Sequence, residues 1–437
     1  MIVKTKDYQK LLIATVCLML SFPPIVLFVN LLCGAIFGAD FSLDTLLCYI
    51  ALVCMVLASM KQIIGSIKID VLFFVLIFVV AYAISYSFFE ENRFYMFTQW
   101  NDFNSNPAYQ LFAFSLPAYI FMRYITDYDR LYKTLSYFAM SVVLCSLGIF
   151  IILVVNDSQP EYMDFSYNML FSVLFLSVYF FEKKKPLCLI AAIIGIGLVF
   201  FAGARGPLMC YCIGLAAYLL MRDIPRSKKI IWIVVLVVLS TIVMLLWQQL
   251  LTLLMNFSEW IGIKSRSIEM LINGEFSGDS GRREIQKEII SSFSLFGSGL
   301  FGDRVAGSGH YAHNLLLELI SQWGVLLGLA FIVVLAILFY HGIRTKNYSM
   351  RLIILILLAS SPLKLMLSGS YLVYNSSFFL LIGACVNALD TVPAESAGEI
   401  EKPKDISTSR YIKGRKRIGG RREKGNAEFC EKKPASS

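Results

Sequence analysis

The stretch that decides the fold runs from Pro186 to Gly203 and reads PLCLIAAIIGIGLVFFAG. It contains no charged residue, and the three lysines Lys183 to Lys185 stand directly before it. An uninterrupted apolar run of about 20 residues between polar gaps is typical of a helix that crosses a lipid bilayer. We therefore predict a membrane-spanning helix here.

Similar apolar runs recur along the chain and are separated by short polar segments. The 437 residues are 57% hydrophobic and only 16% charged, which is too little polar surface to cover a water-soluble globule. This composition excludes ordinary soluble, disordered, collagen-like and disulfide-rich secreted proteins. We predict an all-α polytopic membrane protein with about twelve transmembrane helices, at roughly residues 11–37, 42–60, 69–89, 107–124, 134–155, 165–181, 186–203, 206–221, 229–250, 323–341, 351–368 and 371–389.

The distribution of lysine and arginine predicts which side of the membrane each loop faces. With the N-terminus inside, 30 of the 39 basic residues fall on the inner side, and six of the other nine lie in one large extracytoplasmic loop, residues 251–322. The even number of spans then places both the N- and the C-terminus in the cytoplasm. We expect a multi-pass protein of the cytoplasmic (inner) membrane, with a transmembrane domain over residues 1–390 and a basic, disordered cytoplasmic tail over residues 391–437.

The net charge of +9 does not indicate a nucleic-acid-binding protein. The tail holds twelve basic and seven acidic residues, so it carries +5 and the rest of the chain only +4. The predicted topology leaves no folded cytoplasmic module that could organise a nucleic-acid surface, so we expect no nucleic acid as partner. The basic tail could contact anionic membrane lipids, or it could act only as a topogenic signal.

Most residues that could carry chemistry outside the membrane lie in the large loop. It contains the adjacent Arg282 and Arg283 and two of the three histidines of the chain, His310 and His313. Planar arginine donors suit phosphate and pyrophosphate, and histidine is the side chain best suited to accept a proton near neutral pH. A further outer arginine, Arg205, lies in a glycine-rich turn at membrane level, where charge is costly and usually functional.

Local signals predict the structure of the second half of this loop. Asp279 or Ser280 can cap a helix that runs from about Arg282 to Phe293. A glycine-rich turn follows at residues 296–302, and a helix over residues 315–323 begins just after the second histidine.

Pro362 breaks the eleventh predicted span close to Lys364, whose ammonium could reach a phosphate or snorkel outward. The chain contains no P-loop and no Asp-x-Asp pair of the kind expected for a metal-bound sugar nucleotide. Outer arginines with one candidate base and no nucleotide motif suit group transfer from a lipid-linked pyrophosphate, whose leaving group is already activated.

Two parts of the sequence resemble the signature of the O-antigen ligase and polymerase superfamily of bacterial membrane glycosyltransferases. Residues 202–206, AGARG, are similar to the Ser-Gly-Ser-Arg-Gly segment that follows a mid-chain span in that family. The second part comprises SGRR at residues 280–283, FGSG at 296–299 and AHNLLLELISQWGVLLG at 312–328. It is similar to the family's order of Arg, Gly-x-Gly, His-Asn-x-x-Leu and Gly-x-x-Gly.

The sequence departs from the family pattern in two places. Ala204 replaces the second serine, and the arginine doublet leaves open whether Arg282 or Arg283 matches the family residue; we favour Arg282. Plainer interpretations also stay open, since Arg205 could be a snorkelling topological charge and His313 a polar residue that merely starts a helix.

The resemblance implies a metal-independent glycosyltransferase without a cofactor. Arg205 and Arg282 would hold the pyrophosphate of a polyprenyl-pyrophosphate-linked oligosaccharide, and His313 would deprotonate the acceptor hydroxyl. Asn314 and Glu318 could orient this histidine or begin its helix. The further candidates for substrate binding are Arg283, Lys364, Asn314, Glu318 and His310.

We favour an O-antigen, capsular or exopolysaccharide repeat-unit polymerase that acts on the outer face of the membrane. Its partners would be the lipid-linked oligosaccharide, membrane lipids, a chain-length regulator and a flippase. One alternative is an O-antigen ligase-type transferase to lipid A core or protein, which differs in its acceptor. The other is a lipid-linked oligosaccharide flippase or transporter, which would carry its charges in a central cavity rather than in one outer loop.

Overall fold

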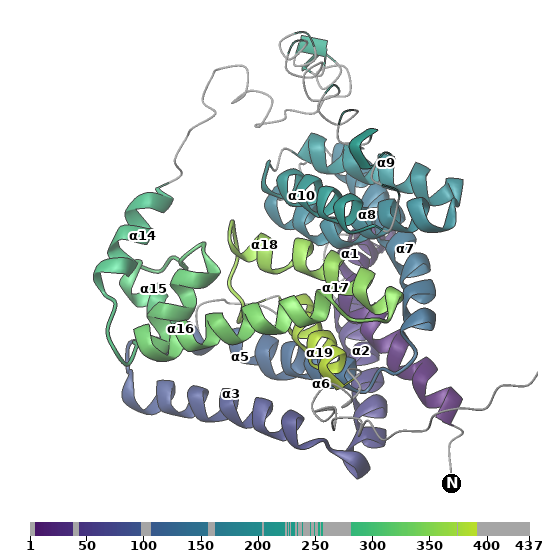
Figure 1. Cartoon of the computed structure of the whole chain (residues 1–437). Coiled ribbons are helices and arrows are strands. Elements are labelled where there is room, and N and C mark those ends of the chain that lie inside the picture. Colours follow the sequence, from purple (N-terminus) through teal and green to yellow (C-terminus); the bar gives the residue numbers. More distant parts are fainter. Residues whose placement is uncertain are drawn as a thin grey trace, which may run out of the picture. The chain divides into compact units, whose positions relative to one another are not determined.

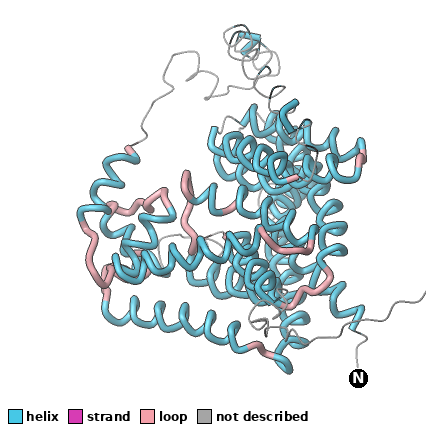
Figure 2. The backbone as a smooth tube through the Cα atoms, viewed as in Figure 1, coloured by secondary structure: helices cyan, strands magenta, loops and turns pink. Residues whose placement is uncertain are grey.

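The computed structural model describes residues 5–37, 43–97, 106–155, 162–202, 205–222, 281–373 and 375–390, together with isolated residues between 225 and 256. All of them belong to one compact unit that spans Met1–Val392. Throughout these ranges the regular elements are helices (Figure 2), and strand-type pairing is limited to one isolated bridge between Ser370 and Val373. The predicted all-α fold is confirmed.

Among the described residues, seven helices are long and apolar enough to cross a membrane. They are Tyr8–Phe37, Leu47–Ser66, Ile69–Phe88, Tyr128–Val155, Met163–Lys183, Leu315–Ile343 and Tyr348–Leu365. Shorter apolar helices cover Pro186–Ala202, Gly206–Met221 and Ser376–Asp390. The chain is therefore a multi-pass membrane protein.

The lateral surface of α16 (Leu315–Ile343) supports this conclusion. Val333, Val334 and Ile337 are more than half exposed in the second half of this helix. Contiguous apolar surface of this kind is rare on soluble monomers, whereas lipid tails cover it at no cost.

The number of spans stays a prediction. The ninth predicted span, residues 229–250, lies largely outside the described residues, and so does the predicted tail, residues 391–437. Of the predicted outer loop, the continuous description begins at Gly281. The cytoplasmic location of both termini likewise stays a prediction.

The first half of the chain forms a bundle around α7 (Tyr128–Val155). This helix packs against α1 (Thr5–Phe37), α8 (Tyr162–Lys183) and α9 (Pro186–Ala202), and α1 also contacts α2 (Leu43–Ile63). A 3₁₀ turn at Ile64–Ser66 follows α2. The prolines in the middle of α1 do not end that helix, in agreement with its sequence-based prediction.

The second half of the chain packs on this bundle through α10 (Arg205–Met221), which contacts α8, and through α17 (Tyr348–Ser360), which contacts α10, α8 and α7 (Figure 1). In turn, α17 packs against α19 (Ser376–Asp390), which also contacts α16 and α6 (Leu116–Arg123).

Two short helices lie beside the first turns of α16 (Figure 1): α14 (Arg282–Ser291) and α15 (Gly302–Ala306). The first is two residues shorter than predicted. The segment between α14 and α15 forms hydrogen bonds with α3 (Ile69–Phe88) and α4 (Asn92–Phe97). Within it, Leu300 N donates to Ser85 Oγ at 2.7 Å and accepts, through its carbonyl, a bond from Asn92 Nδ2 at 2.9 Å.

The predicted span over residues 107–124 is not one continuous α-helix. It is divided into α5 (Pro107–Tyr109), a π-helical segment η3 (Gln110–Ser115) and α6. Pro117 stands at the start of α6, where it lacks an N–H and its ring crowds the carbonyl of the preceding turn. The wider π turn accommodates this proline.

The predicted break at Pro362 is confirmed. The α17 helix ends at Ser360, and the proline starts the separate short helix α18 (Pro362–Leu365), which carries Lys364. The predicted span over residues 351–368 is thus shorter than expected as a single α-helix.

The last predicted span, residues 371–389, begins later than expected. Its helix α19 starts at Ser376, because the side-chain amide of Asn375 donates to the carbonyls of Ser370 and Val373 and closes a turn. Asparagine side chains compete with helix formation in this way.

The helix predicted over residues 315–323 and the span predicted over residues 323–341 form one element, α16. A kink at Gly324 bends it, where φ is 80° and ψ is 166°. Only glycine adopts this conformation without strain.

The kink allows a neighbouring segment to bond to the helix backbone. Ser298 N donates to Ser321 O at 3.0 Å, and Gly299 N donates to Gln322 O at 3.1 Å. In an unbroken helix these carbonyls would accept from residues four positions later. The glycine-rich turn predicted at residues 296–302 therefore packs directly on α16.

Replacing Gly324 or Gly297 by alanine should destabilise the protein, because a Cβ on either residue would lie 2.3 Å from backbone atoms of the other segment. The backbones would have to separate, at a cost of about 1–3 kcal/mol or more. Thermal unfolding in detergent measures the effect. Gly197→Ala in α9 is the matched control, since a Cβ there meets nothing within 4 Å. Equal unfolding temperatures for Gly324→Ala and Gly197→Ala would contradict this prediction.

Candidate active site

Arg282 is the first residue of α14 and points its guanidinium toward the turn after α18. Its Nη1 donates to Leu367 O at 3.0 Å, and its Nε is buried without a hydrogen-bond partner in the part of the chain that is described. Gly281, with φ 73°, occupies the N-cap position of this helix, and no side chain caps the helix there. The predicted caps, Asp279 and Ser280, do not occupy that position and lie outside the described residues.

His313 lies directly before α16 in a left-handed conformation, with φ 51°. Its ring is 4.1 Å from that of Tyr311, centroid to centroid. Its Nδ1 is buried and has no partner within the described ranges, so Nε2 is the nitrogen that a substrate can reach. Asn314 caps α16 by accepting from the N–H groups of Leu316 and Leu317, so of its two proposed roles the structure shows that it begins the helix.

Burial lowers the pKa of His313 to about 4, and the positive charges of Arg282 and His310 act in the same direction. The ring is therefore neutral at neutral pH and can accept a proton. The helix that begins with Arg282 also contacts the segment of His313 directly, since Gln286 Nε2 donates to Ala312 O at 3.4 Å.

Tyr167 of α8 connects these residues to the rest of the site. The ammonium of Lys364 lies over its ring, 5.3 Å from the centroid, and the charge of Arg282 acts on its hydroxyl. A Cβ built on Gly206 would lie only 2.2 Å from the same hydroxyl.

The structure thus brings Arg282, His313 and Lys364 together with the first turn of α10 around Tyr167. Arg205 is the first residue of that helix, and its side chain lies outside the described part of the structure. No signal in the sequence indicates Tyr167, since an aromatic residue within an apolar span looks like any other packing residue.

The other candidates differ in exposure. His310 is exposed and lies near enough to His313 to affect its charge. Arg283 is exposed on α14. Within the described ranges, no three His, Cys, Asp or Glu side chains form a group that could hold a metal ion.

Glu318, predicted to bind substrate or to orient His313, has another position. It is 1% exposed and accepts hydrogen bonds from Ser370 Oγ and from Tyr371 N at 3.3 Å. The side chain of Gln322 also donates to it, at 3.4 Å. Glu318 therefore belongs to a buried hydrogen-bond network, and its role in binding substrate stays a prediction.

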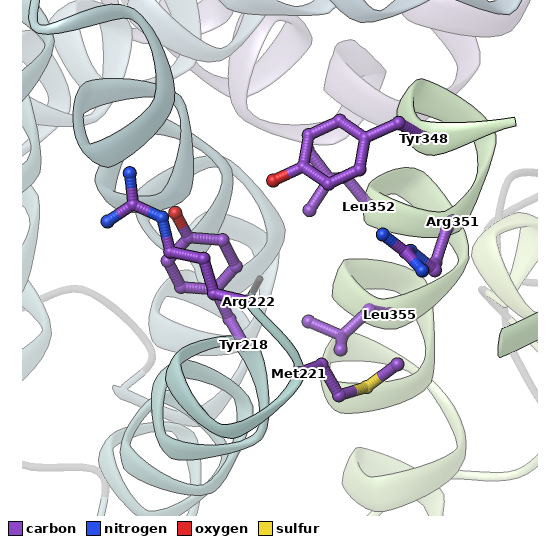
Figure 3. Close-up of a pocket in the computed structure, with 7 residues that line it drawn as sticks. All are labelled: Tyr218, Met221, Arg222, Tyr348, Arg351, Leu352 and Leu355. Atoms are coloured by element: carbon purple, nitrogen blue, oxygen red, sulfur yellow. The ribbon is translucent and has the colours of Figure 1, made fainter. Parts of the chain in front are cut away.

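A separate polar cluster lies at the other end of α10, about 24 Å from its start by helix rise over the 17 residues. Glu182 of α8 accepts from Tyr218 and pairs with Arg222 at 3.3 Å. The hollow beside it holds only about 10 Å³ (Figure 3) and is lined by Tyr218, Met221, Arg222, Tyr348, Arg351, Leu352 and Leu355. This space is enough for about one water molecule, so the cluster joins α8, α10 and α17 rather than binding a substrate.

Residues 190–332 match the family model described as O-antigen ligase. The match confirms the resemblance to the O-antigen ligase and polymerase superfamily. Arg205, Arg282 and His313 all lie within the matched O-antigen ligase segment, and Lys364 lies beyond it. The match supports a membrane enzyme of this ligase or polymerase type. No curated protein and no solved structure matches the chain.

Without substrate, His313 should make the stability of the protein depend on pH. The unfolded histidine titrates near pH 6.5 and the folded one near 4, so the unfolded chain binds the extra proton between these values. This contribution is complete above pH 6.5 and is lost as the pH falls toward 4. The unfolding temperature of the wild type, minus that of His313→Gln, should therefore decrease between pH 7 and pH 4.5. A difference that is constant or grows on acidification would refute this.

Gly206→Ala should displace Tyr167 from its place beneath Lys364, because the new methyl group would overlap the tyrosine hydroxyl. We expect a loss of about 1–3 kcal/mol in the free energy of unfolding. Tyr167→Phe in the same chain removes that oxygen, and the next atom of the ring lies 3.2 Å from the position of the new Cβ. The double variant should then unfold at the temperature of Tyr167→Phe alone. Additive losses in the double variant would show that the clash is not the cause.

Proposed function

We propose that the chain is a polysaccharide polymerase that joins polyprenyl-pyrophosphate-linked oligosaccharide repeat units on the outer face of the cytoplasmic membrane. The observation that carries the proposal is the neutral, partly buried His313 beside Arg282 in the segment that matches the O-antigen ligase family. The pair combines a proton acceptor with a fixed positive charge, which is what transfer from a glycosyl diphosphate requires.

In the proposed reaction, Arg282 and Arg205 bind the diphosphate of the donor, and Lys364 adds a third positive charge. Nε2 of His313 takes the proton from the acceptor hydroxyl. The acceptor oxygen forms a bond to the anomeric carbon while the bond from that carbon to the diphosphate oxygen breaks. The electron pair of the broken bond and its negative charge go to the diphosphate, where the arginines stabilise them.

The low pKa of His313 describes the site before the donor binds. Part of this lowering comes from the charge of Arg282. A bound diphosphate offsets that charge, so the pKa of His313 rises and the ring becomes a stronger base. Binding of the donor therefore prepares the base for the acceptor.

Transfer to lipid A core or to protein would use the same donor site, so the acceptor decides between polymerase and ligase. Purified protein supplied only with lipid-linked repeat units should produce a ladder of longer lipid-linked chains. A product that forms only when lipid A core or an acceptor protein is added would indicate a ligase. Movement of the lipid-linked units across vesicle membranes without any new glycosidic bond would indicate a flippase.

Arg205→Ala, Arg282→Ala and His313→Ala should each lower the rate of chain extension by about 100-fold or more, because each removes charge stabilisation or proton transfer in the transition state. Chain length on gels and the amount of protein in the membrane are the measurements. Lys287→Ala is the matched control, an exposed basic residue of the same α14 helix. Long chains in all three variants would refute the proposed chemistry.

A further inference from the structure

Two carboxylates are buried in the layer beneath His313. Asp303 of α15 is 0% exposed and Glu318 of α16 is 1% exposed. Both accept from the side-chain amide of Gln322, whose Nε2 lies 2.7 Å from Asp303 Oδ1 and 3.4 Å from Glu318 Oε1. Arg304 is buried beside them, and both carboxylates act on its charge. Buried charges persist only where such partners surround them.

One arm of this network leads to His313. The second oxygen of Asp303, Oδ2, accepts from the backbone N–H of Ala312 at 3.2 Å. Ala312 is buried and directly precedes the histidine. His313 has φ 51°, a conformation that a non-glycine residue keeps only where surrounding contacts enforce it. The bond to Asp303 is such a contact.

The other arm leads to the turn that receives Arg282. Tyr371 Oη donates to Gln322 Oε1 at 2.7 Å, and Trp323 Nε1 donates to that hydroxyl at 3.0 Å. Glu318 binds the same turn through Ser370 and the N–H of Tyr371. Four residues before Tyr371, the carbonyl of Leu367 accepts the bond from Arg282.

The side-chain amide of Gln322 connects the two arms of the network, because it donates on one side and accepts on the other. Its Nε2 must donate to Asp303 and its Oε1 must accept from Tyr371, so only one orientation of the amide satisfies both neighbours. The same residue contributes its backbone carbonyl to Gly299 at the kink of α16. Hydrogen bonds therefore fix both the side chain and the backbone of Gln322.

We propose that Asp303 and Gln322 are positioning residues that hold the base His313 and the Arg282-binding turn in register with each other. The inference deepens the proposed function and rests on it for the roles of these two site residues. Neither positioning residue touches the substrate, because both are buried.

The test exchanges the donor and acceptor within the network. In Asp303→Asn, one of the two accepting oxygens becomes an NH2 group. This NH2 then faces another donor, which is either Ala312 N or Gln322 Nε2. In Gln322→Glu, a third carboxylate joins two buried ones. In the double variant, the new amide donates to the new carboxylate, its oxygen still accepts from Ala312, and the carboxylate still accepts from Tyr371. The longer bond from residue 322 to Glu318, 3.4 Å in the wild type, is the one contact that is not restored. The net charge of the network is the same as in the wild type.

Each single variant should lower kcat for chain extension on the order of 100-fold with little change in KM, because the base is misplaced while the charges that bind the donor remain. The double variant should recover most of this loss, with a remainder from the missing bond to Glu318. Glu182→Gln removes a largely buried carboxylate at the far end of α10 and should leave kcat unchanged. A double variant that folds but is no better than the worse single variant would overturn the proposal.

A second readout does not depend on the reaction. The chain has three histidines, so the ring signals can be followed by NMR in detergent, and that of His313 is the one lost in His313→Gln. Its pKa should rise toward 6.5 in Asp303→Asn and return in the double variant. An unchanged titration in Asp303→Asn would overturn the positioning role.

The two readouts separate this inference from the proposed function. If the wild type does not extend lipid-linked units but the NMR titration follows the expected pattern, the proposed function fails. The positioning of His313 by Asp303 and Gln322 is then still supported. If the wild type extends them and Asp303→Asn changes neither kcat nor the titration, the inference fails alone. Should Asp303→Asn not fold, Tyr371→Phe tests the same network by removing the hydroxyl that bonds to Gln322, and it should shift kcat and the titration in the same direction.

Discussion

The contact between the glycine-rich turn and the kink of α16 is the constraint on which the candidate site depends. At Gly324 the helix bends, and the carbonyls of Ser321 and Gln322 accept from Ser298 and Gly299 instead of continuing the helical ladder. This contact fixes the first turns of α16 against the loop that contains α15. The side chain of Gln322 then faces Asp303, and the backbone before His313 is held. The two backbones can approach closely because the residues at their crossing, Gly297 and Gly324, are both glycines.

Arg123 and Arg282 differ in the groups that pair with their charges. Arg123, which is 3% exposed, bonds to Asp70 at 2.6 Å and to Asp390 at 2.9 Å, and its charge is fully used to join α3, α6 and α19. Arg282 bonds to the neutral carbonyl of Leu367, and no carboxylate pairs with it within the described ranges. Its charge therefore remains available to an anionic ligand, which is the arrangement that recognition of a diphosphate needs.

The sequence was sufficient for the properties that depend on local composition. Apolar runs predicted the helices, Pro362 predicted the break after α17, and the spacing of Arg282 and His313 within the family signature predicted two residues that the structure brings together. Features that depend on contacts between distant segments were not predictable in this way. Tyr167 lies in an apolar span, and the bonds of Asp303 and Gln322 depend on a kink that no periodicity indicates. The burial of Glu318 could not be predicted either, because it depends on the folded turn at Ser370.

In the proposed reaction, the proximity of Arg282 and His313 sets both the strength of the base and its dependence on the donor. A histidine held this close to an arginine is a weak base on its own, because its protonated form is destabilised by burial and by the neighbouring charge. A donor whose diphosphate neutralises that arginine removes part of the penalty. The effect falls off with distance, so it requires the two side chains to keep their spacing as the substrate enters. The proposed chemistry therefore requires a buried network that holds both of their backbones, and this requirement would account for carboxylates beneath the site despite the cost of burying them.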